Sequence, residues 1–480
     1  MDVAAYRAGV EEFIGALEGE YVLHLSGRKP TFDIEPIYER HAALFERDAV
    51  ERLREVAPPE LVRFAVEGFI GQATKSEAAE IARLEASLVI EVNSAELPYR
   101  QTSIEQANAQ DPERRAALEA GRLAVMEAEL NPLHLEAHER ATALARELGW
   151  SSTLAMCEEL SGIDLRALGR QSEEFLAATD PWYEAVLSPE LERELGFGLA
   201  RLRRSDIGAF LRAPALDWAF SSEQLLPSYE LTLAGLGLDG GGVRLDLEER
   251  PNKTPRAFCA PVRVPDEVHL VMARVGGRDD YEVLMHEAGH AQHYARVAPE
   301  LPVEARYLGD NSVTEGFAFL FQHLVSAPEW LAATLDVQEP RSLIRHSQAT
   351  RLLMLRRYCA KLLYELELHG GELADGAAPA RYAKGLSEAV RVEWSATSWL
   401  TDVDPFFYAA RYLRAWALET HLRRLLRERF GAHWFAEPEA GALLSSLWRD
   451  GQARGADELL GDLSGERLDL SAVARDLAPG

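Results

Sequence analysis

Two histidines and a glutamate occur in a pattern that can hold a metal ion and use it. His286 and His290 are four residues apart, and Glu287 follows the first histidine directly. In a helix the two imidazoles would project from one face, one turn apart, where they can bind a single zinc ion. Glu287 could then take a proton from a metal-bound water. The pattern predicts a catalytic zinc site, and the alternative is a pair of surface histidines on an amphipathic helix.

A catalytic zinc ion also needs a third protein ligand and an open fourth position. The best candidate is Glu315, in a segment that predicts a second helix with an apolar inner face. A metal would neutralise a lone carboxylate in such a place. Asp310 is the main substitute. The spacing of Ser312 and Glu315 also has the form of a capping box, in which Glu315 would only fold back onto the helix start.

The residues that must position this site lie where the hydrophobic periodicity of the sequence changes. A glycine cluster at 240–242 interrupts a helical pattern, and period-two alternation follows it. Asp279 or Asp280 can cap the helix that carries the histidines. We therefore expect a small antiparallel sheet and then that helix, at about 243–247, 256–264, 267–275 and 281–297.

The rest of the sequence predicts a mainly α fold without a fixed-period repeat. Apolar residues recur at three- and four-residue spacing among Ala, Leu, Glu and Arg. The glycine cluster suggests a division into an N-terminal helical half, 1–235, and a catalytic half, 236–480. The clearest N-terminal helices are expected at 3–20, 35–57, 76–95, 112–130, 134–149, 171–178 and 188–203.

Composition excludes several classes of protein. The 480 residues hold 51 Lys and Arg against 78 Asp and Glu, and the resulting charge of -27 repels nucleic acid. No apolar run approaches the roughly 18 residues that span a bilayer, so we expect no membrane partner. The first 20 residues lack the pattern of a signal peptide. Three widely spaced cysteines support no disulfide framework, which favours a reducing cytoplasm.

The motif around His286 and His290 resembles that of the zinc oligopeptidases, which include thimet oligopeptidase and oligoendopeptidase F. These enzymes are gluzincin metallopeptidases, and angiotensin-converting enzyme is a more distant relative. In that family the third ligand is a glutamate about 25 residues after the second histidine, where Glu315 stands. The resemblance implies one Zn²⁺ per chain, bound by His286, His290 and Glu315, with Glu287 as the general base. The family signature His-Glu-x-Gly-His-Ala-x-His is matched by His286, Glu287, Gly289, His290, Ala291 and His293.

Two further stretches resemble that family. The stretch 250–259 is similar to its segment at a sheet edge beside the metal, where a strand pairs with an extended substrate. Within 404–416, Tyr408 and Tyr412 would lie one turn apart, and the resemblance implies that they donate hydrogen bonds to the oxyanion. The alternative is that both are core aromatic residues. The family usually has a histidine shortly before these tyrosines, whereas this chain has Asp402 and Asp404.

The resemblance covers roughly 240–430 and implies an elongated, mostly helical body with a deep channel and zinc near its floor. We expect a zinc-dependent metallopeptidase that hydrolyses short oligopeptides. If acidic residues line the channel, basic peptides should be preferred. One alternative is a carboxypeptidase or dipeptidyl carboxypeptidase, which would need a cationic group for the substrate's C-terminal carboxylate. The other is a catalytically silent helical metal-binding scaffold. His293 could contact and orient a metal ligand, or it could simply be a packed core residue.

Overall fold

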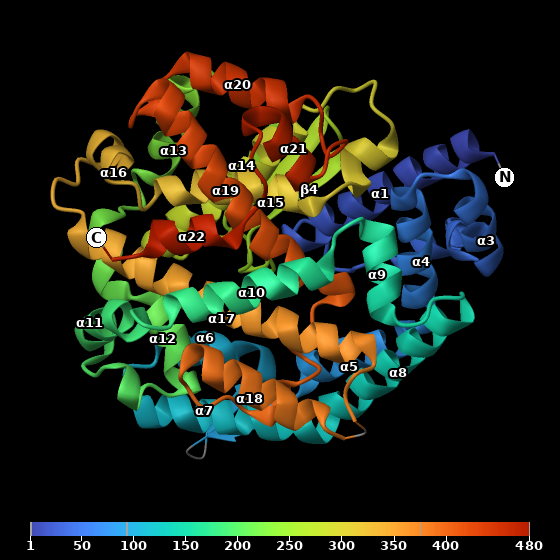
Figure 1. Cartoon of the computed structure of the whole chain (residues 1–480), viewed down its shortest axis with the longest axis horizontal. Coiled ribbons are helices and arrows are strands. Elements are labelled where there is room, and N and C mark those ends of the chain that lie inside the picture. The colour runs from blue at the N-terminus through green and yellow to red at the C-terminus, as the bar shows by residue number, and fades with distance from the viewer. Residues whose placement is uncertain (1, 93–94, 375, 480) are drawn as a thin grey trace. The chain divides into compact units, whose positions relative to one another are not determined.

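The computed structural model describes residues 2–92, 95–374 and 376–479, and helices dominate it (Figure 1). This confirms the expected mainly α fold. The described ranges contain a two-stranded and a three-stranded sheet. All three cysteines are free thiols, as their spacing predicts. In these ranges no helix is both long enough and apolar enough to cross a membrane.

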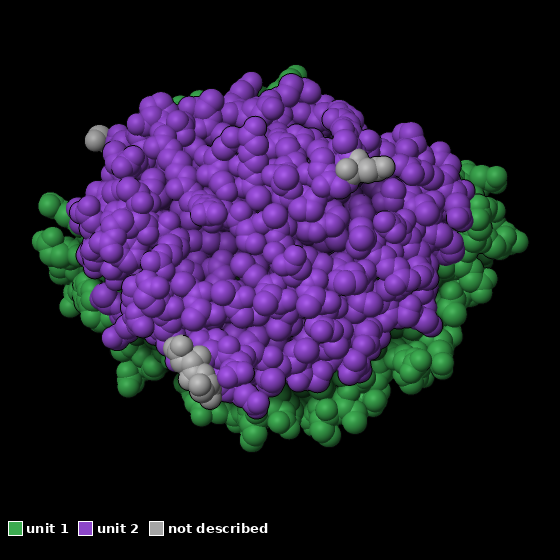
Figure 2. Space-filling view, turned by 90° about the horizontal axis from the view of Figure 1, so that it is seen from below, with its two compact units in different colours: residues 1–68, 216–344, 414–476 green, residues 69–215, 345–413, 477–480 purple. Residues whose placement is uncertain are grey.

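The chain divides into two compact units, which Figure 2 shows in different colours. Unit 1 comprises residues 1–68, 216–344 and 414–476, and unit 2 comprises residues 69–215, 345–413 and 477–480. The units do not follow the expected division at residue 235, because each draws on both halves of the sequence. An apolar helix face is buried by whichever helices complement it, and these need not be close in sequence.

Unit 1 contains the three-stranded sheet and the helices that pack around it. Its elements are α1 (Val3–Leu25), α2 (Glu35–Arg40), α3 (Arg47–Val56), α13 (Leu225–Gly235), β3 (Val243–Asp246), β4 (Phe258–Arg263), β5 (Glu267–Val271), α14 (Arg278–Tyr294), α15 (Asn311–Leu324), α16 (Pro328–Leu335), α20 (Pro438–Trp448) and α21 (Ala456–Ser464). Four helices contain a boundary between the units: α4 (Pro59–Ala73), α17 (Arg341–Gly370), α19 (Tyr408–Phe430) and α22 (Leu470–Leu477).

Unit 2 holds most of the N-terminal helices and the two-stranded sheet. Its elements are α5 (Lys75–Ser87), β1 (Val89–Val92), β2 (Ala95–Pro98), α6 (Thr102–Asn108), α7 (Pro112–Val125), α8 (Asn131–Glu147), α9 (Thr153–Ser161), α10 (Leu165–Thr179), α11 (Tyr183–Leu195), α12 (Ile207–Arg212) and α18 (Ala378–Val390).

Three expected helices differ from what their periodicity suggested. The one expected at 35–57 is divided into α2 and α3, with extended backbone at Glu46. The helix expected at 76–95 ends at Ser87, and β1 follows it and pairs antiparallel with β2. The β-branched residues Val89, Ile90 and Val92 favour a strand there, and the last two are buried. The helix expected to reach residue 203 ends at Leu195, because the next residue is a glycine in the left-handed region.

The three-stranded sheet is mixed rather than wholly antiparallel. Its order is β3-β5-β4, with β4 antiparallel and β3 parallel to the central strand β5. The long loop after β3 carries the chain past the position that β5 later occupies. Strand β3 therefore neighbours β5 and runs parallel to it, whereas consecutive hairpins would make neighbouring strands antiparallel. Strand β4 therefore lies at the sheet edge, a position that suits Pro261 because proline has no N–H to donate.

Candidate metal centre

Helix α14 carries the two histidines and begins at Arg278, three residues before the expected start at Tyr281. Gly277 precedes it with φ 78°, a conformation that favours glycine. The Asp217 carboxylate accepts a hydrogen bond from the Arg278 N–H at 2.9 Å. The cap expected from Asp279 or Asp280 is not formed: Asp280 accepts instead from two amides of the preceding loop. The direction of α14 is therefore set by its contacts with both the loop and Asp217.

Three predicted ligand atoms converge between α14 and α15. The Nε2 atoms of His286 and His290 each lie 3.5 Å from Oε2 of Glu315. One ligand atom from each residue lies within 4.8 Å of the others, and no other such group of three or more occurs among the described residues. Zinc bonds of 2.0–2.1 Å in tetrahedral geometry separate ligand atoms by about 3.4 Å. The donor set and its spacing fit a zinc ion.

The other nitrogen of each imidazole is held by α15. His286 Nδ1 lies 2.9 Å from Gln322 Oε1, and His290 Nδ1 lies 2.8 Å from Thr314 Oγ1. If each Nδ1 carries the proton and donates it, each Nε2 presents a lone pair toward Glu315, which is the tautomer that a metal ligand needs. The sequence analysis missed both partners. The signal was available, because Thr314 adjoins Glu315 and Gln322 follows it by seven residues, two helical turns on the same face.

The cluster is largely shielded from water, so its charged groups interact strongly with one another. The side chains of His286, His290 and Glu315 are 20%, 12% and 6% exposed. Burial alone would raise the pKa of Glu315, but the two imidazoles hold it well below its usual range. Burial alone would lower the pKa of His286, yet Glu315 raises it. The site therefore stabilises Glu315 as a carboxylate when positive charge lies beside it. A divalent metal ion would supply such a charge.

The two candidates for the third ligand, Asp310 and Glu315, have different surroundings. The N-cap of α15 is Asp310, whose carboxylate accepts from the Ser312 N–H at 3.0 Å. Ser312 is therefore inside the helix, so the capping box is not formed. Asp310 also lies 2.8 Å from the Arg414 guanidinium and accepts from the Ala456 N–H at 3.0 Å. Asp310 fixes the start of α15, and Glu315 is the carboxylate that faces the histidines.

A glycine allows α14 and α15 to lie close enough for this convergence. A Cβ added at Gly289 would lie 2.5 Å from both Ala318 Cα and Phe317 O. Such contacts are well inside the ordinary van der Waals range. Gly289 lies one residue before His290, so the close backbone approach is built into the motif itself. Any larger residue would push apart the helices that hold the three ligands.

The remaining motif residues have distinct surroundings. Glu287 is partly exposed, and its negative charge acts on the His286 ring and the Cys259 thiol. His293 is fully buried, its Nε2 lies 3.2 Å from Gly451 O, and burial lowers its pKa to about 3. Its ring stacks on Tyr294 with 5.4 Å between centroids. His293 is therefore a packed core residue, while Glu287 stays accessible.

Tyr408 and Tyr412 belong to unit 2, whereas the three ligands belong to unit 1. Their rings contact each other edge to face at 4.9 Å between centroids, as expected for residues one turn apart. Asp404 does not cap α19, which begins only at Tyr408 because Phe406 has a left-handed φ of 51°. The Asp404 carboxylate lies 2.9 Å from Lys361 Nζ. The oxyanion role of the tyrosines stays a prediction.

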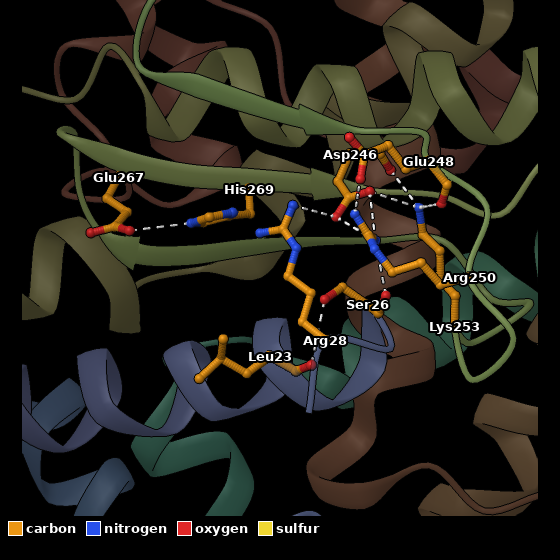
Figure 3. A network of polar contacts seen from close by, with 9 residues as sticks. All are labelled: Leu23, Ser26, Arg28, Asp246, Glu248, Arg250, Lys253, Glu267 and His269. Carbon is orange, nitrogen blue, oxygen red and sulfur yellow. Dashed lines mark hydrogen bonds and ion pairs between the residues drawn. The ribbon is translucent and has the colours of Figure 1, made fainter. Parts of the chain in front are cut away.

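The stretch before β4 is fixed by a polar network centred on Asp246 (Figure 3). The buried Asp246 carboxylate lies 2.9 Å from Arg28 and 3.0 Å from both Arg250 and Lys253. Lys253 Nζ also donates to the carbonyls of Asp246 and Glu248. These contacts join the end of α1 to the loop between β3 and β4, so the edge strand is held in one position.

Comparison with known proteins found no match: neither a family model nor a curated protein matches the chain.

Proposed function

We propose that this protein is a zinc-dependent metallopeptidase that hydrolyses short oligopeptides. The observation that carries the proposal is the convergence of His286 Nε2 and His290 Nε2 on Glu315 Oε2 at the spacing of zinc ligands. Anchored Nδ1 atoms on both rings, and Glu287 on the same helix, support a catalytic rather than a purely structural site. A structural site has no need of a base beside its ligands.

In this proposal each residue has one chemical task. His286, His290 and Glu315 would hold the zinc ion, which would supply a Lewis acid to the reaction when bound. The Glu287 carboxylate accepts the proton that the attacking water loses and passes it to the leaving nitrogen. Thr314 and Gln322 keep the imidazoles oriented. The phenols of Tyr408 and Tyr412 remain the predicted donors to the oxyanion. One Zn²⁺ per chain, oligopeptide substrates and a cytoplasmic location, which suits the free cysteines, belong to the proposal.

The test combines metal content with peptide hydrolysis. We expect the wild type to bind one zinc ion and to cleave peptides from a broad library. Glu287→Gln should retain zinc but lose about 10²- to 10⁴-fold in kcat, because only the proton transfer is removed. Glu315→Gln should bind zinc more weakly, since a charged ligand is lost. Glu300→Gln is the matched control, because Glu300 is exposed and its nearest cation, Arg449, is 3.8 Å away.

The products distinguish the alternatives. Internal cleavage of peptides blocked at both ends supports the endopeptidase, whereas cleavage only of peptides with a free C-terminal carboxylate indicates a carboxypeptidase. If the wild type binds zinc and cleaves no peptide in the library, the proposal is wrong and the metal-binding scaffold is favoured.

A further inference from the structure

One face of α1 lies against the edge strand of the three-stranded sheet. Gly15, Glu18 and Gly19 are spaced by three and four residues and so share a face of the helix. A Cβ added at Gly15 would lie 3.1 Å from Val262 O of β4, and one at Gly19 would lie 4.0 Å from Val262 Cγ1. The two glycines let the helix approach β4 closely, and Glu18 projects from the same face between them.

Glu18 differs from other partly buried or buried acids nearby because none of the cations in the described part of the chain pairs with it. Glu11 pairs with Arg306, Glu20 with Lys29 at 2.7 Å and Glu304 with Arg7 at 2.5 Å. Among the described residues Glu18 makes no hydrogen bond or ion pair, although it is partly buried. Burial raises its pKa to about 7. A carboxylate in this position is costly alone and would be stabilised by a positive charge.

The surroundings of Glu18 overlap those of the metal centre. The Cys259 thiol on β4 is subject to the negative charges of both Glu287 and Glu18. The Tyr294 phenol at the end of α14 is likewise subject to those of Glu18 and Glu315. The described groups on which the charge of Glu18 acts are this thiol and the phenols of Tyr21, Tyr294 and Tyr307, and burial raises the pKa of each, so all are neutral at neutral pH. Both α1 and α14, the helix that carries Glu287, contact the edge strand.

The C-terminal end of α1 is fixed to the segment that leads into β4. At the C-terminal end of α1, Arg28 reaches Asp246 and the Ser26 carbonyl accepts from Arg250 (Figure 3). The Thr254 N–H donates to the Leu25 carbonyl at 2.8 Å. Because these contacts tie α1 to the segment that leads into β4, Glu18 is held beside the edge strand without support from a cation.

We propose that Glu18 is a specificity-determining residue that receives a cationic group of the bound peptide, either a lysine or arginine side chain or the N-terminal ammonium. This inference rests on the proposed peptidase function. It assigns the expected preference for basic peptides to one carboxylate rather than to the overall acidic charge. A peptide that extends along β4 would bring its own cation to the place where the protein supplies none.

The test uses pairs of quenched fluorogenic peptides that are identical except for lysine or norleucine at one position, all blocked at both ends. A second arm compares free and acetylated N-termini on a neutral peptide. We expect a wild-type ratio of kcat/KM of about 10 or more in favour of the cation at one position or at the free N-terminus. In Glu18→Gln this ratio should fall to about 1, and Glu18→Asp should retain part of it.

Glu12→Gln is the matched control, because Glu12 is exposed on the same helix. It should keep the wild-type ratio. If Glu18→Gln keeps the wild-type ratio at every position, the inference is overturned while the peptidase function stands. If the wild type cleaves nothing, the proposed function fails, and anisotropy of the same labelled peptides still tests Glu18. Tighter binding of the cationic peptide that is lost in Glu18→Gln supports the inference, and equal binding of both peptides to the wild type overturns it.

Discussion

Replacing Gly289 with alanine tests whether the close crossing of α14 and α15 sets the geometry of the metal site. The new Cβ would lie 2.5 Å from Ala318 Cα, 2.5 Å from Phe317 O and 2.8 Å from Ala318 N. All three atoms belong to the backbone, so no side chain can rotate away to make room. The two helices must separate, and α15 carries Glu315, Thr314 and Gln322 with it.

The size of the effect follows from these contacts. Ordinary carbon contacts are about 3.5–4.0 Å, so the helices must move apart by about 1 Å. A shift of that size would lengthen the contact between His290 Nδ1 and Thr314 Oγ1 from 2.8 Å to beyond hydrogen-bond range. Loss of such a supporting contact typically lowers metal affinity about 10- to 100-fold. Overpacking should also cost about 1–3 kcal/mol of unfolding free energy, partly offset by the helix propensity of alanine.

The assay measures zinc affinity by competition with a chromophoric chelator and measures the thermal unfolding midpoint without metal. Gly461→Ala is the matched control: it lies in a helix of the same unit, and its Cβ would meet nothing within 4 Å. This control should bind zinc like the wild type and be slightly more stable. If Gly289→Ala binds zinc within about twofold of the wild type and unfolds at the same temperature, the close crossing does not position the ligands and the reasoning is refuted.

Two predictions concern buried carboxyl groups away from the reacting atoms. Burial alone would raise the pKa of Asp310, but Arg414 and the neighbouring amides hold this pKa well below its usual range. The contribution of Asp310 to stability is therefore complete at neutral pH and is lost as the pH falls below about 4. Asp310→Asn should cost about 3–5 kcal/mol at pH 7, and its midpoint should approach that of the wild type in acid; a constant difference from pH 7 to 3 would contradict this. In unit 2, burial raises the pKa of Glu365 to about 8. The folded state keeps this proton while the unfolded chain loses it above about pH 4.3, so wild-type stability should fall from pH 5 to 8. The neutral Glu365→Gln should gain stability over the wild type across that interval, and parallel pH curves for the two proteins would refute this assignment.

The clustering of the two histidines was predictable because most of its information is local. His286, Glu287 and His290 lie within one turn and a half of helix, so their common face follows from helical geometry alone. Glu315 could be proposed from an isolated carboxylate in an apolar segment. Its convergence with the histidines depends on how α14 crosses α15, which is a tertiary contact. Thr314 and Gln322 were missed for the same reason, since their partners lie on the other helix.

The features that sequence analysis predicted poorly depend on long-range pairing. The parallel pairing of β3 with β5 results from a loop that skips one strand position, and strand periodicity carries no information about order or direction. Four boundaries of the two units fall inside α4, α17, α19 and α22, where the helical pattern continues without a break. A change of composition, such as the glycine cluster at 240–242, marks a change of secondary structure and not the edge of a compact unit.

Asp310 shows how a residue suggested as a ligand can serve the site in another way. It stands five residues before Glu315, and its carboxylate caps α15, pairs with Arg414 and accepts from the Ala456 N–H. A carboxylate used in three such contacts cannot also turn toward the histidines, because both of its oxygens are occupied. By fixing the first turn of α15, it fixes the rotation of the helix and so the direction in which Glu315 points. The two acids of this segment therefore have different roles: Asp310 orients the helix, and Glu315 faces the two histidines.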